Sequence, residues 1–395
     1  MASALILGGG ISGLSAAWFL RKKDPAMKIV LLEKQPRLGG CIATRKMGDH
    51  LFEMGPRTFQ ASRSPHLLAL IEEVGLGSEL VFSDPSAKTR YLWHRGRLKT
   101  LGSLWPRALL AASHDLLASK GDGSDESIHA FASRRFGKAA AELFFDPLAK
   151  GVFGGDIRKL SMQACFPLLH QLEATHRSVI FGLLKRKRPP GPSGLFTLRG
   201  GMQQLIEALK TVPDEIHLDC EIEKILPDGV IAGGRTWMAD QIVSALPGND
   251  IAKLCGIDLG LRNELLTVIN LGYAQPLSIR GYGYLVPTME GEELLGQIWD
   301  SAIFPTGGGA KVTSMVRGNR PEEVALDAMR RHLGWTHEPE AMWRQDALIP
   351  QYDMGHRARI ERFIQAASLK FPRLKLVGNY LTGPSVEACI RETRS

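Results

Sequence analysis

The sequence predicts an α/β fold in which a doubly wound domain, a second domain with a mixed sheet and an inserted helical domain share one chain. Three observations predict it. The first 40 residues alternate strand, glycine turn, helix and strand, the middle of the chain is helical, and strand signals return after about residue 216. At 395 residues the chain also exceeds what one hydrophobic core usually supports.

The chain opens with a βαβ unit. Residues 5–7 form a short apolar run typical of a buried strand, residues 11–23 place apolar side chains on one helical face, and residues 29–32 are a second apolar run. Strands joined through a helix pair in parallel. The unit therefore predicts a parallel sheet with helices on both faces.

The later segments predict how the chain leaves this domain and returns to it. Residues 98–184 are helical in pattern and end in the basic quartet 185–188 and a proline-rich linker, while strand signals follow at 216–225, 230–231 and 241–247. Alternating runs between 271 and 316 predict a second sheet that floors a cavity, and 375–379 predicts a last strand before a glycine turn. We expect boundaries at 1–88, 192–250 and 372–395 for the first domain, 89–97 and 251–371 for the second, and 98–191 for the helical domain.

The net charge, the cysteines and the lengths of the apolar runs limit the partners and the compartment that the protein can have. The formal charge of +8 favours an anionic partner, which leaves nucleic acid, an anionic bilayer face and an acidic small molecule open. The odd number of cysteines, five, without a C-x-x-C pair indicates neither a disulfide framework nor a zinc site, and it fits a reducing compartment. The N-terminus shows no leader, and no run approaches the roughly 18 apolar residues of a membrane span. Any membrane contact is therefore expected to be peripheral, with the basic quartet either a solvated loop or a lipid-facing surface.

A glycine motif carries the first chemical signal. Gly8, Gly9, Gly10, Ile11, Ser12 and Gly13 form G-x-G-x-x-G directly after a strand and at the start of a helix. In that context the glycines permit a tight turn, close approach of a pyrophosphate and close helix packing, and the helix N-terminus faces the phosphates. Glu33 ends the second strand, where a carboxylate would accept hydrogen bonds from ribose hydroxyls. The motif predicts a dinucleotide cofactor.

Two further segments favour FAD over NAD. Arg37, Leu38, Gly39 and Gly40 follow Glu33 closely, and a second glycine pair there suits a longer cofactor that lies across the domain. The far C-terminal strand and glycine turn at 377–383 could complete the site at the isoalloxazine end. The eleven histidines show no spacing typical of a metal site, and we nominate no metal ligand and no catalytic residue.

Eight motifs, in chain order, resemble those of the protoporphyrinogen oxidases, and the resemblance covers essentially the whole chain. They are Gly8 to Gly13, Arg37 to Gly40, Phe52 to Arg57, Gly151 to Gly155, Cys165 to Pro167, Thr175 to Ser178, Leu198 to Gly201 and Ile349 to Tyr352. The first two and Leu198 to Gly201 are shared with the wider amine oxidase and phytoene desaturase group. The motifs at 151–155, 175–178 and 349–352 are more particular to the porphyrinogen oxidases.

The resemblance implies a set of site residues. The implied FAD contacts, beside the glycine motif and Glu33, are Lys34, Arg37, Gly39, Gly40, Cys41, Gly55, Pro56, Arg57, Thr58, Ile222, Asn379, Pro384, Ser385 and Val386. The implied substrate contacts are Arg90 as a propionate anchor, Tyr282 where the family often has Phe, Gly283, Leu285 and Met315. Core packing remains the alternative for Tyr282, Leu285 and Met315, and a solvated surface arginine is the alternative for Arg90.

The resemblance also implies an activity: oxygen-dependent oxidation of protoporphyrinogen IX to protoporphyrin IX with formation of hydrogen peroxide, in haem biosynthesis. Coproporphyrinogen III as substrate, another amine oxidase-like oxidoreductase and a non-enzymatic FAD-binding protein stay open. Implied partners are the porphyrinogen, oxygen, an anionic membrane surface, ferrochelatase and a second copy of the chain, with no nucleic acid. The implied location is the inner membrane of a bacterium or mitochondrion, with part of the protein in the cytoplasm. The family continues further past Cys389, so we expect either a shorter last helix or an incomplete chain, and either would weaken FAD retention.

Overall fold

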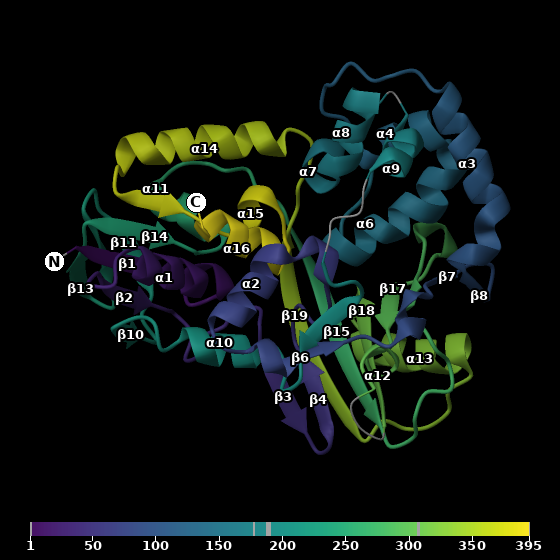
Figure 1. The fold of residues 1–395 in the computed structure, drawn as a ribbon, viewed down its shortest axis with the longest axis horizontal. Helices are drawn as coiled ribbons and strands as arrows, with labels where there is room; N and C mark the ends of the chain where they lie inside the picture. The colour runs from purple at the N-terminus through teal and green to yellow at the C-terminus, as the bar shows by residue number, and fades with distance from the viewer. Residues whose placement is uncertain (1, 177, 187–190, 306–308, 395) are drawn as a thin grey trace.

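A computed structural model describes residues 2–176, 178–186, 191–305 and 309–394. Arg177 of the 175–178 motif, the second half of the basic quartet and the two prolines at 189–190 lie outside these residues. Figure 1 shows a parallel sheet with its helices at one end of the molecule, and a larger sheet beside a group of helices at the other. This arrangement confirms the predicted fold class, while the domain boundaries stay a prediction.

The five-stranded sheet is parallel throughout and collects its strands from three distant stretches of chain. Its order is β10 (Glu215–His217), β2 (Lys28–Leu32), β1 (Ser3–Leu7), β14 (Gln241–Ser244) and β20 (Leu374–Leu376). The expected strand at 216–225 is in fact two strands, because the chain leaves this sheet after His217 and enters a small antiparallel sheet. That sheet consists of β11 (Ile222–Ile225), β12 (Gly229–Ala232) and β13 (Arg235–Met238).

Alternate side chains of β1 serve two separate cores, which makes the domain doubly wound. Ala4 and Ile6 pack among helices on one face, and Leu5 and Leu7 pack on the other. The first face is covered by α1 (Ile11–Lys23), α2 (Pro65–Glu73), α10 (Gln203–Leu209) and α16 (Val386–Arg394). The second face is covered by α11 (Gly248–Cys255), α14 (His356–Lys370) and the small antiparallel sheet.

The seven-stranded sheet is mixed, as expected, since β16 runs parallel to β7 and the other neighbours are antiparallel. Its order is β19 (Ala341–Pro350), β15 (Asn263–Tyr273), β18 (Ala310–Val316), β17 (Leu294–Ile298), β16 (Gly283–Leu285), β7 (Tyr91–Trp93) and β8 (Leu98–Thr100). α13 (Pro321–Leu333) packs on one face. Residues 98–100, interpreted above as the start of the helical segment, are therefore a strand.

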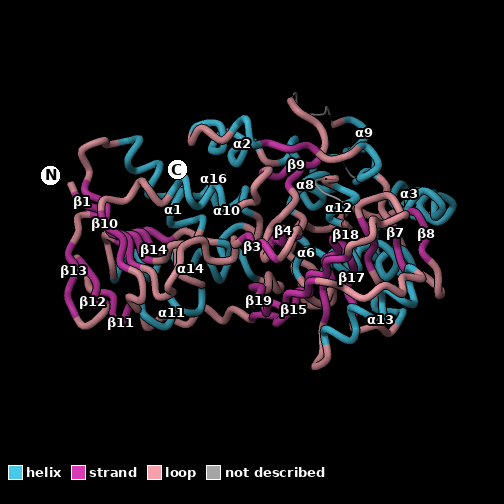
Figure 2. Tube along the Cα trace, turned by 90° about the horizontal axis from the view of Figure 1, so that it is seen from below, coloured by secondary structure: helices cyan, strands magenta, loops and turns pink. Residues whose placement is uncertain are grey.

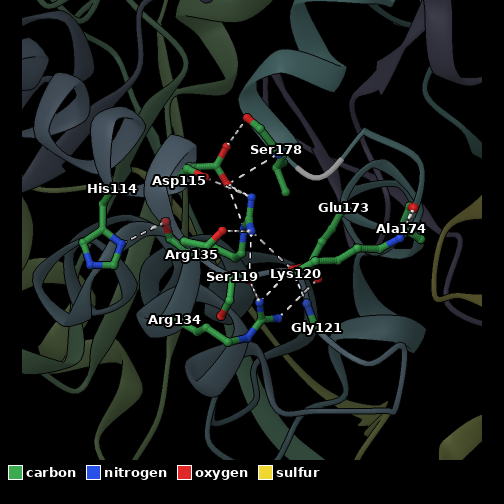
Figure 3. A network of polar contacts seen from close by, with 12 residues as sticks. His114, Asp115, Ser119, Lys120, Gly121, Arg134, Arg135, Glu173, Ala174 and Ser178 are labelled. Atoms are coloured by element: carbon green, nitrogen blue, oxygen red, sulfur yellow. Dashed lines mark hydrogen bonds and ion pairs between the residues drawn. The ribbon is translucent and has the colours of Figure 1, made fainter.

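The helical segment follows β8. Its helices are α3 (Trp105–Leu117), α4 (Ile128–Phe136), α5 (Lys138–Ala140), α6 (Asp146–Phe153), α7 (Met162–Cys165), α8 (Pro167–His176) and α9 (Val179–Lys185). A network of polar contacts joins α3, α4, α8 and the start of α9 (Figure 3). Arg135 of α4 pairs with Asp115 of α3 at 2.6 Å, and both side chains are fully buried. Asp115 also accepts a hydrogen bond from the Ser178 hydroxyl at 2.6 Å, and Ser178 caps α9.

Several small elements lie outside the two large sheets, and Figure 2 shows the hairpin of β3 and β4 between the ends of the molecule. They are the hairpin β3 (Thr44–Met47) and β4 (His50–Glu53), the sheet of β5 (Phe59–Gln60), β9 (Leu195–Leu198) and β6 (Leu80–Phe82), and the short helices α12 (Asp300–Ile303) and α15 (Asn379–Thr382). Among the described residues, no helix combines the length and the apolar character needed to cross a bilayer.

Candidate cofactor and substrate site

The glycine motif forms the turn between β1 and α1, with Ile11 and Ser12 as the first helical residues. Gly10 caps α1 without a side-chain hydrogen bond, and the first turn of the helix holds no acidic residue. A Cβ on Gly13 would overlap the Gly8 carbonyl, so packing requires that glycine. A Cβ on Gly10 would meet only the Cα of Gly40, at 3.9 Å. Packing does not require glycine there, and the N–H groups at a helix N-terminus suit a pyrophosphate.

Glu33 and the second glycine pair lie against this turn. The Glu33 carboxylate accepts hydrogen bonds from the Gly9 N–H at 2.6 Å and the Gln35 N–H at 2.8 Å. Each of its oxygens keeps a lone pair for a ribose hydroxyl. The Gly39 N–H donates to the Gly9 carbonyl at 2.8 Å, so the two glycine segments run side by side.

Three other residues that are expected to contact FAD, Arg37, Lys34 and Ile222, contact protein groups in the structure. The Arg37 guanidinium donates to the Gly40 carbonyl at 2.8 Å and so stiffens the second glycine turn. Lys34 forms an exposed ion pair with Asp250, at 3.4 Å. Ile222 lies at the start of β11, in the core cluster that also contains Leu32. The resemblance implies that all three contact FAD, and this stays a prediction.

The C-terminal segment packs directly on the glycine motif. α16 lies against α1 (Figure 1), and Ser12 hydrogen-bonds to Cys389. Burial raises the pKa of the Cys389 thiol, and the Ser12 hydrogen bond opposes that shift. Ser385, which follows Pro384, accepts a hydrogen bond from the Ala388 N–H at 3.1 Å and so caps the helix that begins at the buried Val386.

The loop with Gly55, Pro56, Arg57 and Thr58 joins the cofactor side to the seven-stranded sheet. A Cβ on Gly55 would overlap the Cys41 carbonyl, so this loop touches the second glycine segment. The Arg57 guanidinium donates to Asn270 Oδ1 at 3.2 Å and to the Thr313 hydroxyl, and it lies 3.7 Å from Asp300.

Tyr282 forms a second link between the loop of residues 55–58 and the seven-stranded sheet. Its hydroxyl is 3.0 Å from the Thr58 hydroxyl, and the Arg90 guanidinium lies 4.2 Å from the centre of its ring. Gly283 adopts a φ of 136°, and a Cβ there would overlap the Gln297 carbonyl. The backbone turn that presents Tyr282 therefore depends on that glycine.

Leu285 and Met315 lie in one row across the sheet. Leu285 of β16 faces Gly296 of β17, which faces Met315 of β18. Met315 and Thr313 share a sheet face because side chains alternate along a strand. A Cβ on Gly151 of α6 would come within 2.8 Å of the Leu285 side chain. The row thus lies between α6 and the Arg57 loop.

A pocket of about 50 Å³ opens beside Thr58. Its polar lining includes Glu53, Arg57, Thr58, Asn270, Asp300 and Lys311. Sequence reasoning missed Glu53, Asn270, Asp300, Thr313 and Lys311 as site residues. Only Asn270 left a signal, since it is a polar residue inside the apolar run of β15.

Glu53 has the most perturbed carboxyl group of this pocket. Burial raises its pKa from 4.5 to about 7, although hydrogen bonds from the Met202 N–H at 2.8 Å and the Thr44 hydroxyl at 2.9 Å oppose the shift. Its second carboxyl oxygen has no hydrogen-bond partner among the described residues. The carboxyl group therefore titrates close to neutral pH.

Three of the motifs quoted above meet in one cluster. The Phe153 ring packs 5.6 Å from the Tyr352 ring and 5.9 Å from the Phe166 ring. Gln351 Nε2 donates to the Phe153 carbonyl at 2.8 Å, and the Tyr352 hydroxyl donates to the carbonyl of Asn379. The cluster ties the helical segment to the C-terminal part of the candidate site.

Fold and site together define an FAD-dependent oxidoreductase. The model of the flavin containing amine oxidoreductase family matches residues 11–284. The human protein named protoporphyrinogen oxidase is 31% identical, over 99% of this chain and 97% of its own. The Bacillus subtilis protein named coproporphyrinogen III oxidase is 25% identical, over 99% of this chain and 96% of its own. A solved structure from Exiguobacterium sp. shares the fold, with a TM-score of 0.86 at 22% identity over 100% of this chain and 97% of that chain.

The particular family follows from these matches. The chain belongs to the protoporphyrinogen oxidase family of flavin-containing amine oxidoreductases.

Proposed function

We propose that the protein oxidises protoporphyrinogen IX to protoporphyrin IX with oxygen as the electron acceptor, in haem biosynthesis. The observation that carries the proposal is the chain of contacts from Thr58 through Tyr282 to Arg90. It connects the loop expected to line the flavin with a cation suited to a substrate carboxylate. The names of the human and Bacillus relatives supply the substrate class.

Each substrate residue has a definable role in this proposal. The Arg90 guanidinium forms no ion pair with any described carboxylate, so its planar fork is available to a propionate. Tyr282 offers a flat ring, and Leu285 and Met315 offer apolar contacts to the macrocycle. Bound FAD would supply the hydride acceptor for oxidation of a methylene bridge of the porphyrinogen. Positioning is then the main task of the protein, because aromatisation makes the conversion downhill.

The test uses the purified protein with its FAD content measured. Protoporphyrinogen IX and coproporphyrinogen III are supplied side by side, and formation of the fluorescent porphyrin is followed together with hydrogen peroxide. We expect faster oxidation of protoporphyrinogen IX. A preparation that holds FAD and oxidises neither compound would refute the proposal, and faster oxidation of coproporphyrinogen III would reassign the substrate.

We also propose peripheral membrane attachment through the helical segment. Exposed apolar side chains gather on α3, α6 and α9, namely Trp105, Leu109, Leu110, Leu116, Leu117, Leu148, Val152, Phe181, Leu183 and Leu184. Contiguous exposed apolar side chains on a helix are typical of a membrane or partner contact. Attachment to the inner membrane, contact with ferrochelatase and a homodimer stay predictions from the resemblance.

A further inference from the structure

A stretch of chain without acidic residues joins the seven-stranded sheet to the helical segment. Residues 85–114 contain no aspartate or glutamate, but they contain six lysines and arginines. These are Lys88, Arg90, Arg95, Arg97, Lys99 and Arg107. The next acid, Asp115, is fully buried and paired with Arg135. The stretch therefore adds positive charge to the surface without a carboxylate of its own to balance it.

Three of these cations lie on one hairpin, which β7 and β8 form at the edge of the sheet. Arg95 and Arg97 of the turn are exposed, and Lys99 of β8 is partly buried. Their side chains form no ion pair with any described carboxylate. Glu290 packs against the turn, but its carboxylate is occupied by the His94 ring at 2.7 Å and by the Arg95 backbone N–H at 3.0 Å. The three charged groups are thus available to an external anion.

Local structure does not account for arginines at the hairpin turn. Arg95 adopts a φ of 56° and Gly96 a φ of 68°. The His94 N–H donates to the Arg97 carbonyl at 2.9 Å and closes the turn. A two-residue turn with both central φ angles positive favours asparagine followed by glycine. A lysine on an edge strand can block unwanted strand pairing, which would explain Lys99 but not the two arginines outside the strands.

The hairpin borders the exposed apolar side chains of α3. β8 leads into α3 through a short helix at Leu101–Leu104, and the Arg107 guanidinium of α3 lies 3.1 Å from the His94 ring. Trp105 is 61% exposed and Leu109 is 58% exposed. Figure 1 and Figure 2 both show β7 and β8 beside α3 at the same end of the molecule. Apolar side chains flanked by cations are typical of a helix that lies in the interface of an anionic bilayer.

We propose that the β7–β8 hairpin binds the phosphate headgroups of an anionic bilayer while α3 inserts its apolar side chains. The inference rests on the proposed membrane attachment, and it adds the class of lipid and a surface outside the helical segment. It does not depend on which porphyrinogen is oxidised. A nucleic acid would also attract the cations, but binding to it through its phosphates would leave the apolar side chains of α3 in water.

A triple variant removes the hairpin charge and keeps the apolar surface: Arg95→Asn, Arg97→Thr and Lys99→Thr. Asparagine suits the left-handed turn position and threonine suits a strand, so the hairpin should still form. The matched control removes three exposed lysines from elements that lie away from α3 in Figure 1. It consists of Lys46→Thr in β3, Lys224→Thr in β11 and Lys253→Gln in α11. Both variants lower the net charge by the same amount.

The measurement is sedimentation with phosphatidylcholine vesicles, prepared with and without phosphatidylglycerol. Each cation near an anionic bilayer strengthens binding about fivefold, so the hairpin variant should bind the anionic vesicles roughly 100-fold more weakly than the unmodified protein. The control should stay within about twofold, because charges further from the bilayer than a Debye length are screened. Salt at about 1 M should remove most of the difference between the two variants.

Equal binding of the hairpin variant and the control would overturn the inference and leave attachment through α3 in place. The same holds if the unmodified protein binds both kinds of vesicle equally. Loss of binding to a DNA duplex without loss of binding to vesicles would assign the hairpin to a nucleic acid and also overturn the inference. Failure of membrane attachment itself would look different, since the unmodified protein would then sediment with neither kind of vesicle.

Thermal unfolding shows whether each variant folds. If the triple variant does not fold, Arg95→Asn alone decides the question, because asparagine fits the turn better than arginine does. This single variant should bind anionic vesicles about fivefold more weakly than the unmodified protein. Unchanged binding of a folded Arg95→Asn protein would overturn the inference.

Discussion

Arg90 stacks on Tyr282 and forms no ion pair within the described residues. Arg90→Ala should raise the Michaelis constant far more than it lowers turnover, since a remote anchor contributes mainly uniform binding. A charge-assisted hydrogen bond of about 1.5 to 3 kcal/mol corresponds to roughly a 10- to 150-fold loss of apparent affinity. Arg90→Lys should recover only part of it, because an ammonium lacks the planar fork. Equal rates for Arg90→Ala and the unmodified protein at low substrate would exclude the anchor.

Glu53 should make stability depend on pH. The folded state keeps this carboxyl group protonated up to about pH 7, whereas the unfolded chain ionises it near 4.5. The folded state binds more protons in that window, so the free energy of unfolding should fall as pH rises from 4.5 to 7. Glu53→Gln should remove up to roughly 3 kcal/mol of this decline. Urea unfolding of both proteins at several pH values measures it, and parallel pH profiles would contradict the assignment.

Local spacing predicted the glycine motif, because Gly8 to Gly13 and Glu33 belong to one βαβ unit. The link between Thr58 and Tyr282 could not be predicted in the same way, since 224 positions separate the two residues. Glu53 was missed for a related reason. Its raised pKa comes from burial, which only the folded chain produces, and the hydrogen bond from the Met202 N–H, 149 positions away, opposes that shift.

At the scale of elements, β19 is a strand that the sequence pattern did not predict. This strand pairs with β15 from Asn263 to Gly272, yet the sequence reading assigned no strand to 341–350. β19 is the edge strand of the sheet, and charged residues such as Arg344 and Asp346 occupy it. An edge strand buries little, so its apolar alternation is weak. β16 and β18, which are interior strands, were recognised from their alternation.

The buried pair of Asp115 and Arg135 should be essential for packing α3 against α4 and α9 (Figure 3). Asp115→Ala leaves the Arg135 charge without its closest partner and should destabilise the protein by roughly 3 to 5 kcal/mol. Thermal unfolding measures the loss. The double variant Asp115→Leu, Arg135→Met should unfold at a higher temperature than Asp115→Ala, because it removes both buried charges. A loss below about 1 kcal/mol, the range of an exposed pair, would show that the network is dispensable.

The apolar surface of α3 should determine membrane attachment. Leu110 is 73% exposed and Leu117 is 86% exposed. Replacing both with Glu should weaken binding to vesicles that contain anionic lipid by at least about tenfold, since each leucine loses its apolar burial. The matched control replaces Leu265 and Leu348, which are also exposed but lie on β15 and β19. Equal binding of both double variants, measured by vesicle sedimentation, would remove α3 from the contact.

At the scale of the whole molecule, FAD should be bound without a covalent bond. Cys389 of α16 is buried and hydrogen-bonds to Ser12 of α1. Burial raises the pKa of the Cys389 thiol, so little reactive thiolate is present. Acid precipitation should therefore release the yellow cofactor into the supernatant. The absorbance of pellet and supernatant measures the outcome, and a pellet that stays yellow would contradict it.

The parallel sheet has a consequence for how the protein is made. β20 completes the sheet by pairing Leu374 with Ile242 of β14, and α16 then closes over α1. A ribosome delivers both elements after the strands of the seven-stranded sheet. The parallel sheet is thus begun before the seven-stranded sheet and completed after it, so a nascent chain arrested before β20 leaves the exit tunnel should fail to retain FAD. Loading of the cofactor becomes an event that follows translation.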